Sequence, residues 1–210
     1  MMPENLLFTI SGPSGVGKSS ILKRLSEVDP NLGFPVSHTS RAPREGEVDG
    51  VHYYFRSADE IMRMETYGDM VESNTAEDGT VYGLSKAEIR RMRRFKAAVV
   101  DLHSTGAKAV KTLLQDRAIL IMLVPAYGDD LERRLKARGT ENPEEIDRRL
   151  GRAITELAAS NEYDYLVVND NLEDALHRIQ AIIQAEFLRM RRKHNEEQIE
   201  NLLDDLCGEI

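Results

Sequence analysis

The sequence predicts an α/β protein built on a central parallel sheet. Three continuous apolar runs, at residues 6–11, 97–102 and 119–124, have the composition of parallel strands that are covered on both faces. Helical patterns alternate with these runs along the chain, as the crossover connections of a parallel sheet require. A glycine-rich segment follows the first run directly, which is typical of a buried strand that enters a tight loop.

Size, charge and cysteine content limit the class of protein. The chain has 210 residues, 41% of them hydrophobic, which suits one core with insertions. Its net charge of −8 disfavours a nucleic-acid partner, although a local cluster of Arg and Lys still allows an anionic substrate. No run reaches the roughly 18 apolar residues of a membrane span, and residues 1–5 lack the basic start of a signal peptide. With Cys207 as its only cysteine, the protein is expected in the reducing cytoplasm, away from membranes.

The first half of the chain is expected to contain many short elements. Strands are expected at 6–11, 34–39, 51–55, 69–72 and near Val81 and Tyr82, helices at 19–25, 57–67 and 85–95, and an ordered loop at 41–50. Ser57 and Glu60 have the spacing of a capping box at the start of the second helix. The short strands between residues 34 and 84 are interpreted as an insertion into the parallel plan.

The second half returns to the alternating pattern. Strands are expected at 97–102, 119–124 and 165–168, and helices at 129–138, at 143–160 and from 172 to near the end. The last helix carries two apolar patches separated by charged residues. The first patch is Leu176, Ile179, Ile182, Ile183 and Phe187, and the second is Ile199, Leu202, Leu203 and Leu206. Two interpretations of the tail stay open: it frays, or it docks on another subunit to form a homo-oligomer.

Residues 12–19, GPSGVGKS, match the phosphate-binding pattern G-x-x-x-x-G-K-[ST] between a strand and a helix. Glycines let the backbone curl so that several N–H groups point at phosphate oxygens, and the helix N-terminus adds partial positive charge. Lys18 is expected to reach the β- and γ-phosphates of ATP, and the Ser19 hydroxyl to bind Mg²⁺. Asp101, which ends the strand at 97–102, is placed to hold the same metal through water.

A longer sequence pattern narrows the choice of phosphate acceptor. Residues 36–55 read VSHTSRAPREGEVDGVHYYF, which resembles the signature of guanylate kinases. The resemblance also covers the phosphate loop, Tyr82-Gly83, R-R-L-x-x-R-G at 133–139 and V-N-D at 168–170, and so spans about residues 6–190. No N-K-x-D motif of the G proteins is present. The resemblance implies a P-loop NTPase that transfers the γ-phosphate of ATP, with Mg²⁺, to GMP and dGMP.

The resemblance also implies how the chain is divided. A P-loop core takes residues 1–33 and 86–190, and contains a mobile lid at about 134–150. A small mixed α/β insertion at 34–85 binds the nucleoside monophosphate. Residues 191–210 form a helical tail.

Individual site residues follow from the motifs and from the resemblance. Arg41 and Arg44, three apart on a proline-stiffened loop, can grip a phosphate with their guanidinium groups, and Tyr53 and Tyr82 can donate hydroxyls to it. By resemblance, Glu72 accepts from the N1–H and N2–H₂ groups of guanine. The full set for GMP is Ser37, Arg41, Arg44, Tyr53, Glu72, Tyr82 and Asp101. The set for ATP is Gly12, Pro13, Ser14, Gly15, Val16, Gly17, Lys18, Ser19, Ser20 and Asn169.

Catalysis is expected to come from cations aimed at the transferred phosphoryl group, where charge spreads over the oxygens. The expected catalytic residues are Lys18, Arg41 and, by resemblance to the family's lid arginines, Arg134, Arg138 and Arg149. Lid closure would also exclude water, which competes as an acceptor.

Two positions depart from the guanylate kinase pattern. Leu84 stands where the family usually has a Ser or Thr that contacts guanine O6, and Ser85 follows one step later. His103 stands where the family has a second Asp near the base. Either local shifts, such as use of Ser85, preserve GMP binding, or the kinase has an altered or relaxed acceptor range. A non-catalytic guanylate-kinase-like binding module is a further alternative, disfavoured because the phosphate loop and the lid arginines are intact.

Overall fold

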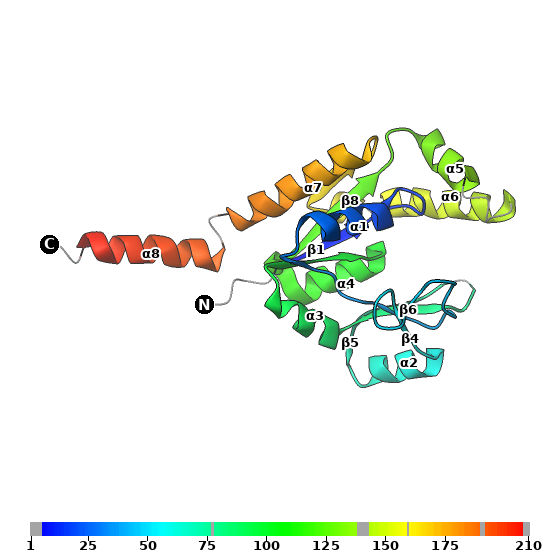
Figure 1. Cartoon of the computed structure of the whole chain (residues 1–210), viewed down its shortest axis with the longest axis horizontal. Helices are drawn as coiled ribbons and strands as arrows, with labels where there is room; N and C mark the ends of the chain where they lie inside the picture. The colour runs from blue at the N-terminus through cyan, green and yellow to red at the C-terminus, as the bar shows by residue number, and fades with distance from the viewer. Residues whose placement is uncertain (1–5, 77, 138–142, 159, 190–191, 208–210) are drawn as a thin grey trace.

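A five-stranded parallel sheet forms the centre of the computed structural model, which describes residues 6–76, 78–137, 143–158, 160–189 and 192–207 (Figure 1). The strand order is β2 (Leu32–Gly33), β7 (Ala97–Asp101), β1 (Leu6–Ser11), β8 (Ala118–Val124) and β9 (Tyr165–Val168). The three apolar runs of the sequence are therefore the three central strands, and the predicted α/β class with a central parallel sheet is confirmed.

Both faces of this sheet are covered, which explains why its strands are apolar throughout. On one face, Phe8 and Ile10 pack with residues of α1 (Lys18–Val28) and α7 (Leu172–Phe187). On the other face, Leu7 packs with residues of α4 (Ser104–Leu114). Successive residues of β1 thus alternate between two cores, as the period of a strand requires.

A second sheet holds the short strands. Its order is β4 (Tyr54–Phe55), β3 (His38–Thr39), β6 (Val81–Ser85) and β5 (Met70–Thr75), and α2 (Ala58–Thr66) packs on it through Ile61. The capping box predicted for α2 is confirmed, because Ser57 and Glu60 each accept from the other's backbone N–H.

Three predicted elements differ from the structure. The strand expected at 34–39 is limited to His38–Thr39, because Pro35 has no N–H for a ladder and the Val36 N–H donates to the Glu88 carboxylate instead, at 2.8 Å. The strand expected at 51–55 is limited to β4, and the helix expected at 85–95 consists of α3 (Lys86–Arg91) and a 3₁₀ turn (Met92–Arg94). Helix α4 was not predicted at all.

The elements of the second half that flank the sheet match their predicted positions more closely. They are α5 (Gly128–Ala137) and α6 (Pro143–Ala158). A 3₁₀ turn (Ser160–Glu162), which was not predicted, leads to β9. Figure 1 shows α5 and α6 extending from the same end of the molecule as the second sheet, while α8 (Lys193–Cys207) extends from the opposite end. No helix in the described ranges has the length and apolar character needed to cross a membrane.

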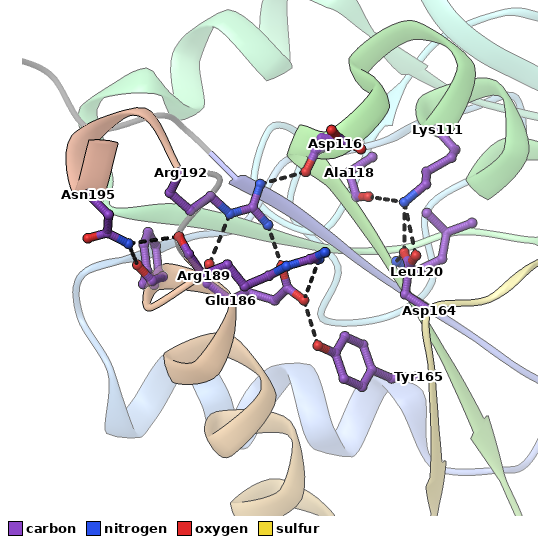
Figure 2. A network of polar contacts seen from close by, with 11 residues as sticks. Lys111, Asp116, Ala118, Leu120, Asp164, Tyr165, Glu186, Arg189, Arg192 and Asn195 are labelled. Carbon is purple, nitrogen blue, oxygen red and sulfur yellow. Dashed lines mark hydrogen bonds and ion pairs between the residues drawn. The ribbon is translucent and has the colours of Figure 1, made fainter. Parts of the chain in front are cut away.

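The long helix expected from residue 172 is interrupted, and a polar network fixes the start of its second part (Figure 2). The buried Arg192 donates to the Glu186 carbonyl at 2.9 Å and the Asp116 carbonyl at 2.6 Å, and pairs with the buried Glu186 carboxylate. Asn195 donates to the Phe187 carbonyl at 3.0 Å. These bonds anchor the first turn of α8, whereas the side chains of Leu203, Leu206 and Cys207 lie outside the described part.

Candidate active site

The glycine-rich loop leaves β1 and closes on itself before α1. Gly12, Gly15 and Gly17 have positive φ angles of 146°, 89° and 106°, which L-residues with side chains rarely adopt. Space is short as well, since a Cβ on Gly12 would lie 2.1 Å from the Leu123 carbonyl oxygen. The loop can therefore take this curl only with glycine at these positions.

Lys18, the first residue of α1, folds back over the loop. Its Nζ donates to the Gly12 carbonyl at 2.6 Å and lies 3.9 Å from Oδ1 of Asp101 at the end of β7. The protein around Asp101 raises the pKa of this carboxyl by desolvation, while the Lys18 ammonium and His103 oppose that rise. An ammonium and a carboxylate thus meet at the carboxyl end of two adjacent parallel strands.

The oxygen donors at this point suit a magnesium ion. Mg²⁺ prefers a few carboxylate or hydroxyl oxygens and takes its other ligands from phosphates and water. The Ser19 hydroxyl is exposed at the start of α1, and the Asp101 carboxylate lies beside the neighbouring Lys18. Because a dication favours the charged form of a carboxylate, it would also offset the desolvation of Asp101.

The second loop holds one of its two arginines in a defined orientation. The Arg41 guanidinium donates to Glu47 through both terminal nitrogens, at 2.8 and 2.9 Å, and stacks over the rings of Tyr53 and Phe55. Arg44 donates its backbone N–H to the same Glu47 carboxylate at 2.7 Å, and its side chain is exposed. Arg41, with the Arg44 N–H, holds the pKa of Glu47 at about 2. Glu47 was not predicted as a site residue.

Two tyrosines connect this loop to the central sheet. The rings of Tyr53 and Tyr82 meet edge to face with centroids 6.2 Å apart. Burial raises the pKa of Tyr53, and the next contribution comes from the charge of Asp101. Tyr53, over whose ring the Arg41 guanidinium lies, thus interacts electrostatically with Asp101 at the end of β7.

Glu72, on β5, lies half-buried against α4. A Cβ on Gly106 of α4 would lie 2.9 Å from Glu72 Oε2, so this carboxylate occupies the room that the glycine leaves open. Burial raises the pKa of Glu72 to about 7, and the charge of His103 only partly opposes this. A carboxylate in this setting gains from any ligand that brings N–H donors to it.

The two departures from the family pattern have structural consequences. Leu84 is fully buried in the core beneath α4, and the Ser85 hydroxyl caps α3 by accepting from the Glu88 N–H at 3.3 Å. Use of Ser85 at the base site is thus not supported. His103 is exposed at the N-cap of α4, and its Nδ1 lies 3.1 Å from Oε1 of Glu156 on α6.

The remaining predicted residues lie around the glycine loop or outside the described part. Arg149 on α6 donates to the Ser14 hydroxyl at 2.7 Å, and the buried Asn169 donates to the Val16 carbonyl at 2.6 Å. Ser37 accepts from the Tyr54 N–H through its carbonyl, at 2.9 Å. Ser20 is exposed on α1, Arg138 lies outside the described residues, and of Arg134 only the backbone, in α5, is described.

A family model described as guanylate kinase matches residues 5–186 of the chain. The guanylate kinase of Pseudomonas fluorescens (strain Pf0-1) is 35% identical over 203 residues, which cover 96% of this chain and 97% of that protein. The guanylate kinase of Symbiobacterium thermophilum is 37% identical over 203 residues, covering 96% and 95%. The crystal structure of guanylate kinase from Anaplasma phagocytophilum matches with a TM-score of 0.75 and 25% identity, over 96% of each chain.

Proposed function

The chain belongs to the guanylate kinase family and phosphorylates GMP with ATP, and we propose that its two loops hold the two nucleotides so that their phosphates meet beside Asp101. The observation that carries this proposal is the convergence at Asp101. On the side of the glycine loop, Lys18 lies 3.9 Å from Asp101. On the side of the second loop, the charge of Asp101 adds to the rise in the pKa of Tyr53 that burial causes.

The glycine loop takes the donor, ATP. Residues 12–17 surround the phosphate chain. The N-terminus of α1 and the loop's backbone N–H groups hold it, except at Pro13, which has no N–H, and at Val16, whose N–H donates to the Pro13 carbonyl at 3.1 Å. Lys18 neutralises the β- and γ-phosphates. Ser14 lies in the loop itself, and Ser19 and Ser20 lie in the first turn of α1. Asn169 stabilises the loop by its hydrogen bond to the Val16 carbonyl, and we propose that it also contacts the adenine of ATP.

The second loop takes the phosphate of GMP. Arg41 and Arg44 bind this dianion with the hydroxyls of Tyr53 and Tyr82. The bidentate bond from Arg41 to Glu47 supports the proposal, because it holds the guanidinium plane in place before a phosphate arrives. Arg41 then aligns the attacking phosphate oxygen, so it belongs to the catalytic set.

The base of the acceptor lies against β5. Glu72 accepts from N1–H and N2–H₂ of guanine, a pattern that adenine lacks, with Ser37 as a neighbouring polar contact. We propose dGMP as a second acceptor because it carries the same base and the same phosphate as GMP. Leu84 offers no hydroxyl to the base, and selection therefore depends more heavily on Glu72.

The transfer itself is a direct in-line displacement. A phosphate oxygen of GMP attacks the γ-phosphorus of ATP, the bond to the β-γ bridging oxygen breaks, and ADP and GDP form. Lys18, Arg41 and the lid arginines Arg134, Arg138 and Arg149 neutralise the charge that spreads over the transferred group. Ser19 and, through water, Asp101 would hold Mg²⁺, which would supply further neutralisation of the ATP phosphates.

The proposal also covers the division into domains, the location in the cell and the oligomeric state. The core comprises residues 1–33 and 86–190, the insertion 34–85 binds GMP, and the lid at about 134–150 closes over the phosphates. The reaction takes place in the cytoplasm, with no nucleic-acid or membrane partner. The exposed side chains of Ile199 and Leu202 in the tail of 191–210 support a homo-oligomer formed through α8.

One assay tests the function. ADP formation is measured in a coupled assay with ATP, Mg²⁺ and, in turn, GMP, dGMP, AMP and UMP. We expect turnover with GMP and dGMP and none above background with AMP and UMP. Equal turnover with AMP would contradict the role of Glu72, and no turnover with any acceptor would contradict the kinase.

A further inference from the structure

Helix α6 touches the site at two separate points. Arg149 and Glu156 are seven residues apart, about two helical turns, so their side chains lie on the same face of α6. Arg149 donates to Ser14 in the glycine loop at 2.7 Å. Glu156 meets Nδ1 of His103, at the start of α4, at 3.1 Å. The helix therefore bridges the donor loop and α4.

The contact between Glu156 and His103 is one that stability alone does not explain. Oε2 of Glu156 is buried and has no hydrogen-bond partner in the described structure. Nearby, burial raises the pKa of Tyr163, the Ser11 hydroxyl opposes this rise, and the charge of Glu156 adds to it. Buried polar atoms without partners cost free energy, so a position that retains them is a candidate for a role in function.

His103 connects this pair to the acceptor side. It is the N-cap residue of α4, three residues before Gly106, which packs against Glu72. Helix α4 also packs along β5, the strand that carries Glu72. A shift of His103 would therefore shift the start of α4, and with it the wall against which Glu72 lies.

We propose that Glu156, acting through His103, is a positioning residue that couples the base side of the acceptor site to the helix that carries Arg149. In this arrangement the same bond keeps the start of α4 against Glu72 and keeps Arg149 over Ser14. Loss of the bond should weaken GMP binding and the transfer step together. The inference rests on the proposed function, which assigns Glu72 to the base and Arg149 to the transferred phosphate.

The test is a double-mutant cycle of Glu156→Ala and His103→Leu, with kcat and the KM for GMP measured well below the Tm of each variant. His103 is exposed, so His103→Leu leaves the core intact, and its KM and kcat alone test the coupling if Glu156→Ala does not fold. His103→Asn is the conservative variant, since its amide N–H lies near the position of Nδ1. Lys108→Met is the matched control. Lys108 is also on α4, and the change removes its 2.7 Å ion pair with Glu162, in the 3₁₀ turn after α6.

We expect each single variant to raise the KM for GMP and to lower kcat, by roughly tenfold each. The double variant should be little worse than either single one, because the two residues act through one bond. His103→Asn should recover activity to within about threefold of the parent. Lys108→Met should leave both constants unchanged.

Other results would overturn the coupling. Variants that lose Tm but keep kcat and KM would assign the pair to stability alone. Additive losses in the double variant, or losses as large in Lys108→Met, would contradict a specific link between the two residues. A parent protein without GMP turnover would overturn the proposed function itself, whereas an active parent with unchanged variants overturns only the coupling.

Discussion

The two ends of the central sheet use polar residues in opposite ways. At the carboxyl end, Oε2 of Glu156 is buried without a partner in the described structure, and Glu72 lies half-buried with a pKa of about 7. At the amino end, Figure 2 shows buried polar groups that are joined to one another. There Arg192 and Glu186 are both almost fully buried, and Glu186 also accepts from the Tyr165 hydroxyl at 2.5 Å.

The difference indicates which end serves function and which serves stability. A buried network in which every polar group is hydrogen-bonded fixes one arrangement of the chain. Buried polar groups without partners can instead gain hydrogen bonds when a ligand binds. The pKa values follow the same division. Desolvation raises the pKa of Glu72, and a ligand can relieve this effect. The pKa of Tyr165 is raised to about 12 by its hydrogen bond to Glu186, in which the hydroxyl is the donor. Substitutions at the two ends should therefore affect different measurements.

The largest expected effect is on the transfer step. Lys18→Ala removes the ammonium that lies between the glycine loop and Asp101, and we expect kcat to fall at least about a thousandfold. The Tm should change little, because Lys18 makes no contact that holds two helices together. Coupled ADP assays and thermal melting measure the two quantities. A kcat within tenfold of the parent would show that catalysis does not depend on this end of the sheet.

The next effect should appear only in stability. Arg192→Met removes the guanidinium that joins Glu186 and the Asp116 carbonyl, and leaves the buried Glu186 with Arg189 and Tyr165 as its partners. We expect unfolding in urea to cost about 2–4 kcal/mol less, with kcat and KM unchanged below the Tm. If kcat fell together with the free energy of unfolding, the amino end would contribute to catalysis as well as to stability, and the two ends would not differ in role.

The third prediction combines both measurements at Glu72. Glu72→Gln replaces one of the two acceptor oxygens by an NH₂ group, which would set a donor against an N–H donor of guanine, so kcat/KM for GMP should fall about a hundredfold. Folding should respond in the opposite direction. The pKa of Glu72 is about 7 in the folded state against 4.5 in the unfolded chain, so the folded state binds more protons between these values. Stability of the parent therefore falls as pH rises from 4.5 to 7.

Because Gln does not titrate, the variant should be more stable than the parent at pH 8, by about 1–3 kcal/mol, and the difference should vanish toward pH 4.5. Urea unfolding at pH 5 and pH 8 measures this. Equal stability at both values would mean that Glu72 is not desolvated. A stabilised but weakened enzyme would support the view that this residue is kept for the ligand.

Periodicity predicted the central sheet because Phe8, Ile10 and their neighbours are buried on both sides, which leaves an unbroken apolar run. Helix α4 was not predicted because Gly106 and the β-branched Thr105 lower the helix propensity of its first turn, although Ala107, Val110 and Leu114 follow a helical spacing. The limits of the short strands depended on Pro35 and on a bond between Val36 and Glu88 that is remote in sequence.

For the site, motif spacing placed the glycine loop and brought Lys18 to Asp101, since both follow parallel strands that end side by side. The partners of the predicted residues could not be read in the same way. Glu47 is visible only as an acidic residue near Arg41, and Glu156 lies more than fifty residues from His103. Such pairs depend on tertiary structure, which a single sequence does not display.

The smallest effect is expected for a second substitution at the amino end. It tests whether the loss in free energy of unfolding depends on burial or on the number of hydrogen bonds removed. Lys111 donates to the Ala118 carbonyl at 2.8 Å and to Asp164 at 2.9 Å, also in Figure 2, but its side chain is 35% exposed. Asp164 keeps the Leu120 N–H as a donor, at 2.8 Å, when Lys111 is removed. Lys111→Met should therefore lower the free energy of unfolding by only about 0.5–1 kcal/mol, well below the loss in Arg192→Met. Equal losses in the two variants would mean that bond number decides, and that the amino end is stabilised by its bonds irrespective of burial.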